Sequence, residues 1–191
     1  MPPQLILASA SPRRSELLTQ IGIRHRIVSV DIDETPWPGE APAAYVTRVA
    51  AEKSAACQAI LNQDLPVLSA DTSVVCDGCI LGKPENSQQA TDMLSRLSGR
   101  SHQVYSAVSL RGDTHGQALS ISQVTFRELS LEEILAYWQT GEPCDKAGSY
   151  AIQGLGSIFI KTITGSFSGV MGLPLFETAQ LLAQQDIKII A

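Results

Sequence analysis

Residues 5–18 have the sequence LILASASPRRSELL, and the rest of the chain is organised around this stretch. The apolar residues 5–8 predict a strand, and the small residues that follow predict a turn into a helix. Ser11 is a favourable N-cap residue. Pro12 suits the first helical position, because its φ is already fixed near the helical value and it has no N–H group to leave unpaired. The stretch therefore predicts a strand–turn–helix unit.

The first turn of this helix carries two arginines where a stable helix would favour acidic residues. The helix dipole disfavours cations there by roughly 0.3–1 kcal/mol each, which applies to both Arg13 and Arg14. Two explanations are open at this point. Either both arginines are solvated at a frayed helix end, or an anion with several oxygens binds at the helix start.

Composition narrows the classes of protein to consider. The chain has 191 residues, 44% of them hydrophobic and 17% charged, as in an ordinary globular domain or two closely apposed lobes. Its net charge of −5 argues against a general nucleic-acid binder but is compatible with a small anionic substrate in a locally basic cleft. No apolar run has membrane-spanning length, and the first residues lack the pattern of a signal peptide. We therefore expect a cytoplasmic protein that neither crosses a membrane nor binds a nucleic-acid polymer.

Two further segments place charged residues at unusual positions. A strand predicted over 24–32 leads to Asp33 and Glu34, a carboxylate pair that is either part of a site at the strand end or the solvated start of a loop. A helix predicted over 43–61 has Lys53 in the middle of its apolar stripe, which comprises Val46, Val49, Ala50, Cys57 and Ile60. That lysine either extends to solvent along its aliphatic stem or meets an anion.

Residues 65–76 predict a central strand that is apolar on both faces, and Asp71 interrupts it. Such a carboxylate is either hydrogen-bonded for structure or bound to a metal ion or water. Asp77-Gly78 predicts a hairpin turn into a short strand at 80–81, so the Cys76–Cys79 spacing favours a turn over a redox or metal site. Gly82-Lys83-Pro84 then fixes a lysine in a loop.

The remaining elements follow from caps, turn residues and apolar runs. Asn86 and Gln89 predict a capping box for a helix that ends at Leu97, and Ser130 and Glu133 predict another for a helix ending near Gly141. The histidines lack ligand spacing, and we expect structural or surface roles for them: His25, His102 and His115. The other expected elements are strands at 103–110, 119–126, 158–163 and 187–190, a small-residue loop at 165–172 and a helix that begins at Pro174.

The residues that look out of place share one chemistry. The cations are Arg13, Arg14, Lys53 and Lys83, and the carboxylates are Glu34 and Asp71. Cations that neutralise phosphate oxygens, next to carboxylates that hold Mg²⁺ or Mn²⁺ and a water, are what metal-assisted phosphate ester or anhydride chemistry requires. The residues themselves lead no further than this reaction class.

Seven stretches resemble motifs of the Maf family of nucleoside triphosphate pyrophosphatases, in the family's order and over nearly the whole chain. They are SASPRRSELL, the Asp33-Glu34 pair, RVAAEKSAA, LSADTSVV, LGKP, DKAGSYAIQG and GSFSGVMGLPL. The resemblance implies a two-lobed, mixed-sheet α/β fold similar to the inosine triphosphatase fold. It implies one Maf-like domain over 1–191, with a central cleft between the lobes, and a homodimer. It also implies hydrolysis of a nucleoside triphosphate to the monophosphate and pyrophosphate with a divalent cation, Mg²⁺ or Mn²⁺.

The resemblance also implies roles for individual residues. Asp71 would be the proton acceptor that activates water for attack at the α-phosphorus, with Lys53 and Lys83 as its catalytic partners. Glu34 would hold the metal together with Asp71. The triphosphate would be bound by Ser9, Arg13, Arg14, Lys53 and Lys83.

Three positions resemble the branch of the family that acts on dTTP and UTP: Arg13, Thr72 and Gln153. The sister branch, which acts on 7-methyl-GTP, tends to have an aromatic residue, Gln and Glu there. A Gln amide both donates and accepts, as a uracil or thymine edge requires. Ala10 and Phe167 depart from the family's pattern, and only fine specificity depends on them.

Other functions are compatible with the same pocket. CTP and modified pyrimidine nucleotides are candidate substrates that the sequence does not rank against dTTP and UTP. A nucleotide-binding regulator of cell division or septum formation would bind a triphosphate without turnover. An enzyme of the inosine triphosphatase type would prefer deaminated purines.

Overall fold

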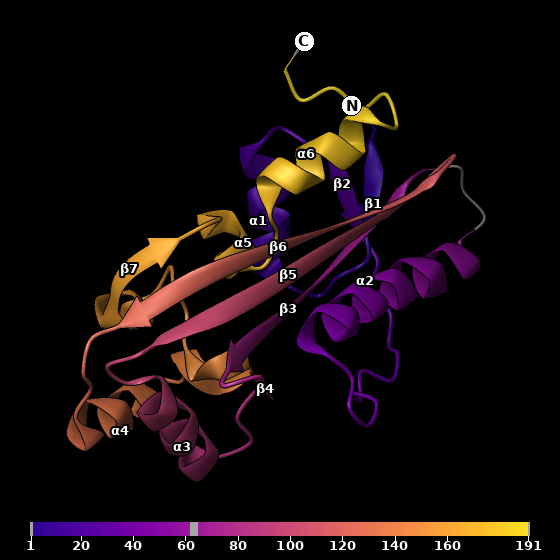
Figure 1. Cartoon of the computed structure of the whole chain (residues 1–191). Helices are drawn as coiled ribbons and strands as arrows, with labels where there is room; N and C mark the ends of the chain where they lie inside the picture. The colour runs from indigo at the N-terminus through magenta and orange to yellow at the C-terminus, as the bar shows by residue number, and fades with distance from the viewer. Residues whose placement is uncertain (1, 62–64, 191) are drawn as a thin grey trace.

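The computed structural model describes residues 2–61 and 65–190 and contains a mixed sheet with helices on both of its faces (Figure 1). The strands are β1 (Leu5–Leu7), β2 (His25–Ile27), β3 (Val67–Cys76), β4 (Cys79–Leu81), β5 (Ser101–Arg111), β6 (His115–Phe126) and β7 (Ile160–Thr164). The helices are α1 (Pro12–Gln20), α2 (Pro42–Ala59), α3 (Ser87–Leu97), α4 (Leu131–Gln139), α5 (Phe167–Met171) and α6 (Leu175–Ala183). Three short 3₁₀ helices are η1 (Glu142–Asp145), η2 (Ala147–Ser149) and η3 (Leu155–Phe159). The α/β class and the mixed sheet are confirmed.

Strand β3 is the centre of the sheet, whose order is β2-β1-β3-β5-β6-β7 with β4 paired to β3. β1 runs parallel to β2 and β3, whereas β5, β6 and β7 continue the sheet in antiparallel pairs. One edge of β3 is shared by two short strands, since β1 pairs with residues 67–68 and β4 pairs with residues 74–76. Within the described residues, no strand pairs with this edge over 69–73. The central strand is therefore open at its middle.

Helix α2 covers one face of the sheet. Alternate side chains of a strand point to opposite faces, and the hydroxyl of Ser69 on β3 donates to the carbonyl of Ala50 on α2 (2.5 Å). Val46, Val49 and Ala50 are fully buried and pack against Ala107 of β5. Because Asp71 lies two residues after Ser69, it points to the same face, toward α2.

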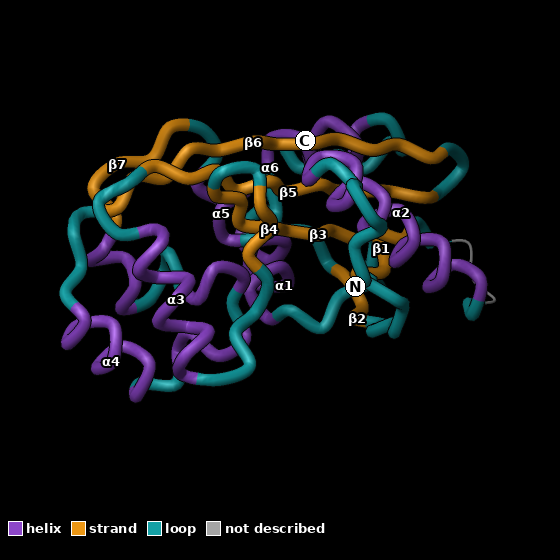
Figure 2. Tube along the Cα trace, turned by 60° about the horizontal axis from the view of Figure 1, so that its bottom comes forward, coloured by secondary structure: helices purple, strands orange, loops and turns teal. Residues whose placement is uncertain are grey.

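The other face carries two apolar clusters at opposite ends of the long strands. One contains Leu68 and Ala70 with residues of α1 and α6, and the other contains Val74 and Cys76 with residues of α3 and α4. Helices α1, α3 and α4 lie together on one side of the sheet in Figure 2. A row of hydroxyl side chains, aligned across β3, β5 and β6, lies between the clusters: Thr72, Ser106 and Ser120. The division of the single domain into two lobes, one around each cluster, stays a prediction. Residues 1, 62–64 and 191 of the predicted domain lie outside the described residues.

Several local predictions are confirmed. Pro12 is the first residue of α1, and Gly22 ends that unit with a φ of +75°. Asp77 and Gly78 both have positive φ, as a type I′ hairpin turn between β3 and β4 requires. The capping box of α4 is present, because Ser130 and Glu133 each accept the backbone N–H of the other.

Other local predictions in the first half of the chain are wrong in detail. Ser11 is at the N-cap position, but its side chain caps nothing, and its backbone N–H donates to the hydroxyl of Ser9 (3.2 Å). Asn86 does cap α3, but the amide of Gln89 accepts the N–H of Glu85 rather than that of Asn86, so the capping box is incomplete. Ile60, expected on the buried stripe of α2, lies beyond the helix and is exposed. The strand expected over 24–32 spans only 25–27, because its partner β1 is equally short.

The second half needs three corrections. The strand expected over 158–163 begins at Ile160, after the 3₁₀ helix η3. The loop expected over 165–172 contains the helix α5, which Ser166 caps by accepting the N–H of Gly169. The strand expected over 187–190 is absent from the described residues, since Ile187 and Ile189 pack against the α1–α6 cluster instead of pairing with a sheet edge.

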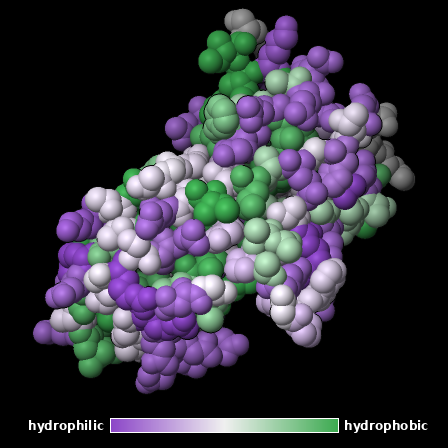
Figure 3. Space-filling model, in the orientation of Figure 1, coloured by the Kyte–Doolittle hydropathy of each residue, from purple (hydrophilic) through white to green (hydrophobic). Residues whose placement is uncertain are grey.

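The surface is mixed in character. On the face seen in Figure 3, hydrophilic residues predominate over α3, and apolar residues reach the surface in smaller areas, with Leu131 and Leu135 exposed on α4. Across the described part of the chain, no helix combines the length and the apolar character needed to cross a membrane.

Candidate active site

A pocket of about 520 Å³ opens at the unpaired middle of the β3 edge. This volume is in the usual range for sites that bind small molecules. The structure brings all of the predicted site residues into the lining of this pocket: Ser9, Arg13, Arg14, Glu34, Lys53, Asp71, Thr72, Lys83 and Gln153. Residues as far apart in the sequence as Ser9 and Gln153 therefore face one cavity.

The gap in the sheet edge explains why the pocket reaches both faces. Asp71 points toward α2 and Thr72 toward α5, since adjacent residues of a strand alternate. Both nevertheless line the same pocket. A neighbouring strand at this position would separate them, whereas the loop after β1 and the β4 hairpin only flank the opening.

The acidic part of the pocket is organised by Lys53. Its Nζ donates to Oδ1 of Asp71 at 3.0 Å and lies 2.9 Å from Oε1 of Glu34. The side chains of Lys53 and Asp71 are only 12% and 9% exposed, whereas that of Glu34 is 49% exposed. The lysine on the apolar stripe of α2 thus meets two carboxylates and does not extend into solvent.

Tyr45 of α2 supports the segment that carries Glu34. Its hydroxyl donates to the backbone carbonyl of Glu34 at 2.9 Å. Burial, followed by the nearby carboxylates of Asp71 and Glu34, raises the pKa of Tyr45 to about 12, so this hydroxyl remains a donor at neutral pH.

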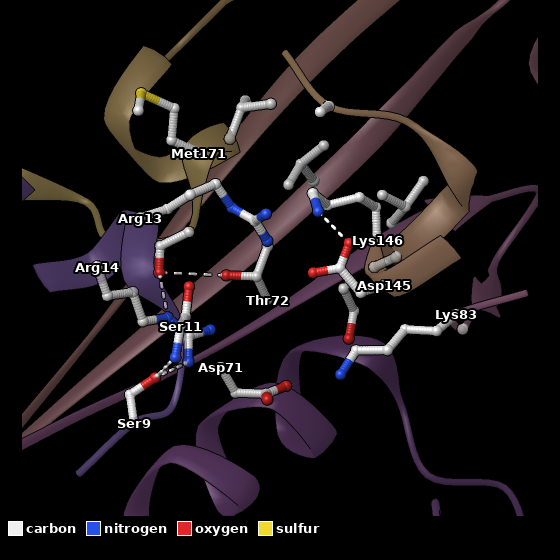
Figure 4. Close-up of a pocket in the computed structure, with 18 of the residues that line it drawn as sticks. Ser9, Ser11, Arg13, Arg14, Asp71, Thr72, Lys83, Asp145, Lys146 and Met171 are labelled. Carbon is white, nitrogen blue, oxygen red and sulfur yellow. Dashed lines mark hydrogen bonds and ion pairs between the residues drawn. The ribbon is translucent and has the colours of Figure 1, made fainter. Parts of the chain in front are cut away.

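The two arginines of α1 occupy different parts of the site (Figure 4). Arg14 donates from Nε to the carbonyl of Gly172 at 2.8 Å and from Nη1 to the hydroxyl of Ser9 at 3.1 Å. Burial lowers the pKa of Arg14 and the carboxylate of Asp71 counteracts this effect. Arg13 lies near Asp145, whose pKa it helps to lower. The Arg14 side chain is therefore held by hydrogen bonds to two other segments, at Ser9 and Gly172, and does not belong to a frayed helix end.

Gly172 joins α5 to the site. Its φ is +122°, a backbone conformation that favours glycine, and its carbonyl oxygen, which accepts from Arg14, lies 3.5 Å from the hydroxyl oxygen of Thr72. Ser106 donates its one hydroxyl proton to the carbonyl of Gly169 in α5 (2.6 Å) and therefore accepts from the hydroxyl of Thr72 (3.0 Å). The hydroxyl row across the sheet thereby fixes both α5 and the side chain of Thr72.

The opposite wall of the pocket contains Lys83 and the segment around η2. Lys146 forms an ion pair with Asp145. Partial burial raises the pKa of Asp145, but the hydrogen bond and charge of Lys146 outweigh it, so that pKa lies below its usual value. Gly148 donates its N–H to the carbonyl of Gly82 at 3.0 Å, which ties this wall to the loop that carries Lys83.

Some pocket residues were not predicted as site residues. Asp145 and Lys146 lie in a glycine-rich stretch, and two adjacent opposite charges among glycines were the available signal. Tyr45 was hidden in the apolar pattern of α2, and Met171 and Gly172 lie in and after a helix that the sequence did not reveal. None of the three histidines lines the pocket; their side chains hydrogen-bond to Ser15, Ser109 and Tyr150, and of these partners Tyr150 is a pocket residue.

The donor set fits a divalent cation that arrives with a phosphate ligand. The described residues contain no group of three or more His, Cys, Asp or Glu side chains that would hold a metal by themselves. They do contain two carboxylates, Glu34 and Asp71, that both face the positive charge of Lys53. Mg²⁺ is usually bound by one or two carboxylates together with substrate phosphates rather than by an all-protein cage.

A family model described as "Maf-like protein" matches residues 4–185. The chain belongs to the Maf-like family. The match extends from the residue before β1 to two residues past the end of α6, so the Maf-like assignment covers every pocket residue.

Curated Maf-like relatives match the chain over nearly its full length. A protein of Methylococcus capsulatus named "dTTP/UTP pyrophosphatase" is 59% identical, with 94% of this chain and 89% of the relative covered. A protein of Pseudoalteromonas atlantica with the same name is 52% identical, with 96% and 97% covered. One of Haemophilus ducreyi named "Nucleoside triphosphate pyrophosphatase" is 49% identical, with 98% of each chain covered.

More distant solved structures were also found. A nucleoside-triphosphatase (dITP/XTP pyrophosphatase) of Mycobacterium abscessus has a TM-score of 0.44 and 14% identity, with 95% of this chain and 93% of that chain covered. The Ham1 protein of Staphylococcus aureus has a TM-score of 0.46 and 15% identity, with 92% and 89% covered.

Proposed function

We propose that this Maf-like protein is a nucleoside triphosphate pyrophosphatase that hydrolyses dTTP and UTP to the monophosphate and pyrophosphate. The observation that carries the proposal is the position of Asp71, whose carboxylate lies in a polar pocket, bonded to Lys53 and close to Arg14. Two relatives that are 52% and 59% identical are named dTTP/UTP pyrophosphatase, which supports the same activity.

The cations of the pocket suit a triphosphate. Arg13, Arg14 and the hydroxyl of Ser9 lie at the start of α1, where free backbone N–H groups and the helix dipole favour an anion. Lys83 faces them across the pocket. Their positive charge neutralises phosphate oxygens and stabilises the charge that moves to the leaving pyrophosphate.

In the reaction we propose, Asp71 accepts a proton from a water molecule whose oxygen attacks the α-phosphorus. The bond from the α-phosphorus to its bridging oxygen breaks, and pyrophosphate leaves with that electron pair. Lys53 positions the carboxylate of Asp71 through their 3.0 Å hydrogen bond, and Lys83 stabilises the leaving group. Glu34 and Asp71 would hold Mg²⁺ or Mn²⁺, which supplies Lewis-acid polarisation of the phosphate oxygens when bound.

We further propose that Thr72 and Gln153 bind the base, beside the triphosphate that Arg13 neutralises. The amide of Gln153 offers both a donor and an acceptor, which matches the edge of thymine or uracil. CTP and modified pyrimidine nucleotides are secondary candidates on the same grounds. We also propose that the protein acts in the cytoplasm as a homodimer, which analytical ultracentrifugation would test.

A substrate panel tests the proposed function. Purified protein is incubated with Mg²⁺ or Mn²⁺ and with dTTP, UTP, CTP, GTP, 7-methyl-GTP or ITP, and pyrophosphate release is measured. We expect the highest kcat/KM for dTTP and UTP. A preference for ITP would replace the proposal with purine house-cleaning, and tight dTTP binding without pyrophosphate release would favour a regulatory protein.

A further inference from the structure

Gln153 lies in a tight turn at the rim of the pocket. The N–H of Gly154 donates to the carbonyl of Ala151 at 3.4 Å, so Ile152 and Gln153 are the two central residues of this turn. Ile152 is buried and Gln153 is exposed toward the pocket. The direction of the Gln153 amide therefore depends on how firmly the ends of the turn are held.

Two side chains outside the pocket lining hold both ends of the turn. The hydroxyl of Tyr137 in α4 accepts the N–H of Ala151 at 3.1 Å. The carboxylate of Glu142 in η1 accepts the N–H of Leu155 at 2.8 Å and that of Gly156 at 2.9 Å.

The same two side chains are bonded to each other. Tyr137 donates its hydroxyl proton to Oε1 of Glu142 at 2.6 Å. Tyr137 is 4% exposed and its ring packs edge-on against Phe159, with 4.9 Å between ring centroids. The hydroxyl and carboxylate thus form one unit, which we call the Tyr137–Glu142 clamp.

The glycines after Gln153 are adapted to this clamp. A Cβ at Gly154 would come within 2.2 Å of Oε2 of Glu142, and a Cβ at Gly156 would come within 2.6 Å of the Tyr137 hydroxyl. Real Cβ atoms do not approach other atoms so closely, so a side chain at either position would displace the clamp. The glycines of the Gly154-Leu155-Gly156 fragment therefore allow the turn to contact the clamp directly.

The charge of Glu142 suits this role. Partial burial raises its pKa, but hydrogen bonds from Tyr137, Gly156 and Leu155 outweigh burial and place the pKa below its usual value. At neutral pH the side chain is therefore an ionised carboxylate that accepts all three hydrogen bonds. An amide at this position would have one acceptor oxygen and would point N–H donors at backbone N–H donors.

We propose that Tyr137 and Glu142 are positioning residues that fix the 151–154 turn and thereby aim the Gln153 amide at the base of the nucleotide. The inference rests on the proposed role of Gln153 in base binding. Neither clamp residue lines the pocket, so the effect of each on the nucleotide passes through the turn.

The test measures binding, so that it gives an answer even for a protein without turnover. Titration calorimetry with Mg²⁺ gives the Kd of the non-hydrolysable analogue thymidine 5′-(α,β-imido)triphosphate and that of inorganic tripolyphosphate, which lacks a base. The variants are Glu142→Gln, Tyr137→Phe, Gln153→Ala and the double variant Glu142→Gln/Gln153→Ala. The matched control is Glu132→Gln, at an exposed glutamate on α4.

We expect Glu142→Gln and Gln153→Ala each to weaken binding of the thymidine analogue by roughly 10-fold, the effect of losing one well-placed hydrogen bond. Tyr137→Phe should act in the same direction, and tripolyphosphate should bind all variants as it binds the unsubstituted protein. The double variant should be no weaker than Gln153→Ala alone, because residues that act through one another are not additive.

The inference is overturned if Glu142→Gln binds the analogue normally, if its affinities for the analogue and tripolyphosphate fall together, or if its effect adds to that of Gln153→Ala. An effect of Gln153→Ala without one of Glu142→Gln would refute the clamp alone. Normal analogue binding by Gln153→Ala would refute the base-binding role on which the clamp depends. Absence of pyrophosphate release from dTTP by the unsubstituted protein would instead refute the proposed function.

Discussion

The substitution Asp71→Asn separates the proposed catalytic role of this carboxylate from its structural one. The asparagine has nearly the same shape, and its side-chain oxygen still accepts from Nζ of Lys53, which lies 3.0 Å from Oδ1 in the native protein. It has no negative charge with which to accept a proton from water. The surroundings that pack against Asp71 are retained.

The catalytic effect of Asp71→Asn should be much larger than its effect on stability. Loss of a general base lowers a rate by about 10²–10⁴-fold, or about 3–5 kcal/mol of transition-state stabilisation. The structural cost is the change from a charge-assisted to a neutral hydrogen bond, about 1 kcal/mol. Lys53 also keeps Glu34 as a charged partner at 2.9 Å. For a chain of this length, 1 kcal/mol lowers Tm by about 2–4 °C.

The assay is continuous detection of pyrophosphate released from dTTP at saturating Mg²⁺, with Tm measured by scanning calorimetry on the same preparations. Asp113→Asn, at an exposed aspartate in the β5–β6 turn, is the matched control and should leave both quantities unchanged. Full activity in Asp71→Asn would refute the proposed mechanism. A Tm loss large enough to unfold the protein at the assay temperature would show that the carboxylate is primarily structural.

Three further predictions concern Lys53, the divalent metal ion and the buried His102. Lys53→Met should lower kcat/KM for dTTP at least 10²-fold and cost about 2–3 kcal/mol in urea unfolding, because the nearly buried Asp71 loses its partner while the half-exposed Glu34 can rehydrate. Chelation with EDTA should abolish pyrophosphate release, and Mg²⁺ or Mn²⁺ should restore it; retained activity in EDTA would exclude a metal requirement. Burial lowers the pKa of His102 to about 4, so the unfolded chain binds this proton first as pH falls. Stability should therefore decrease between about pH 6.5 and 4, by up to roughly 3 kcal/mol from this group, and His102→Gln should flatten that part of the profile.

Residues whose side chains conflict with their local pattern were the most informative part of the sequence. Lys53 on an apolar helix stripe and Asp71 in an apolar strand each cost free energy unless something in the fold compensates them. In the structure each compensates the other, at 3.0 Å. A charged side chain in an apolar pattern marked each residue as unusual. Only the packing of α2 on β3 in the structure shows that the two side chains meet.

Features that depend on distant partners could not be predicted. The apolar residues Ile187 and Ile189 suggested a strand, but a strand needs a free sheet edge, and these residues pack on an apolar cluster instead. Helix α5 is only five residues long and is built from residues with little helical preference. Its position depends on hydrogen bonds to Ser106 and Ser122 in the sheet, which no local pattern encodes.

The open edge of β3 accounts for the organisation of the whole site. A carboxylate in the middle of a central strand ordinarily has a neighbouring strand on each side. On one edge of β3, however, the pairing with β1 stops at Leu68 and the pairing with β4 starts at Val74, so no strand of the described residues lies beside Asp71 there. One pocket can therefore contact Asp71 on the α2 face and Thr72 on the α5 face. Under the proposed function, proton transfer and base recognition then depend on opposite faces of the same strand. Substitutions at Thr72 or Gln153 should consequently change which base is preferred while leaving the Lys53–Asp71 pair, and the chemistry that depends on it, in place.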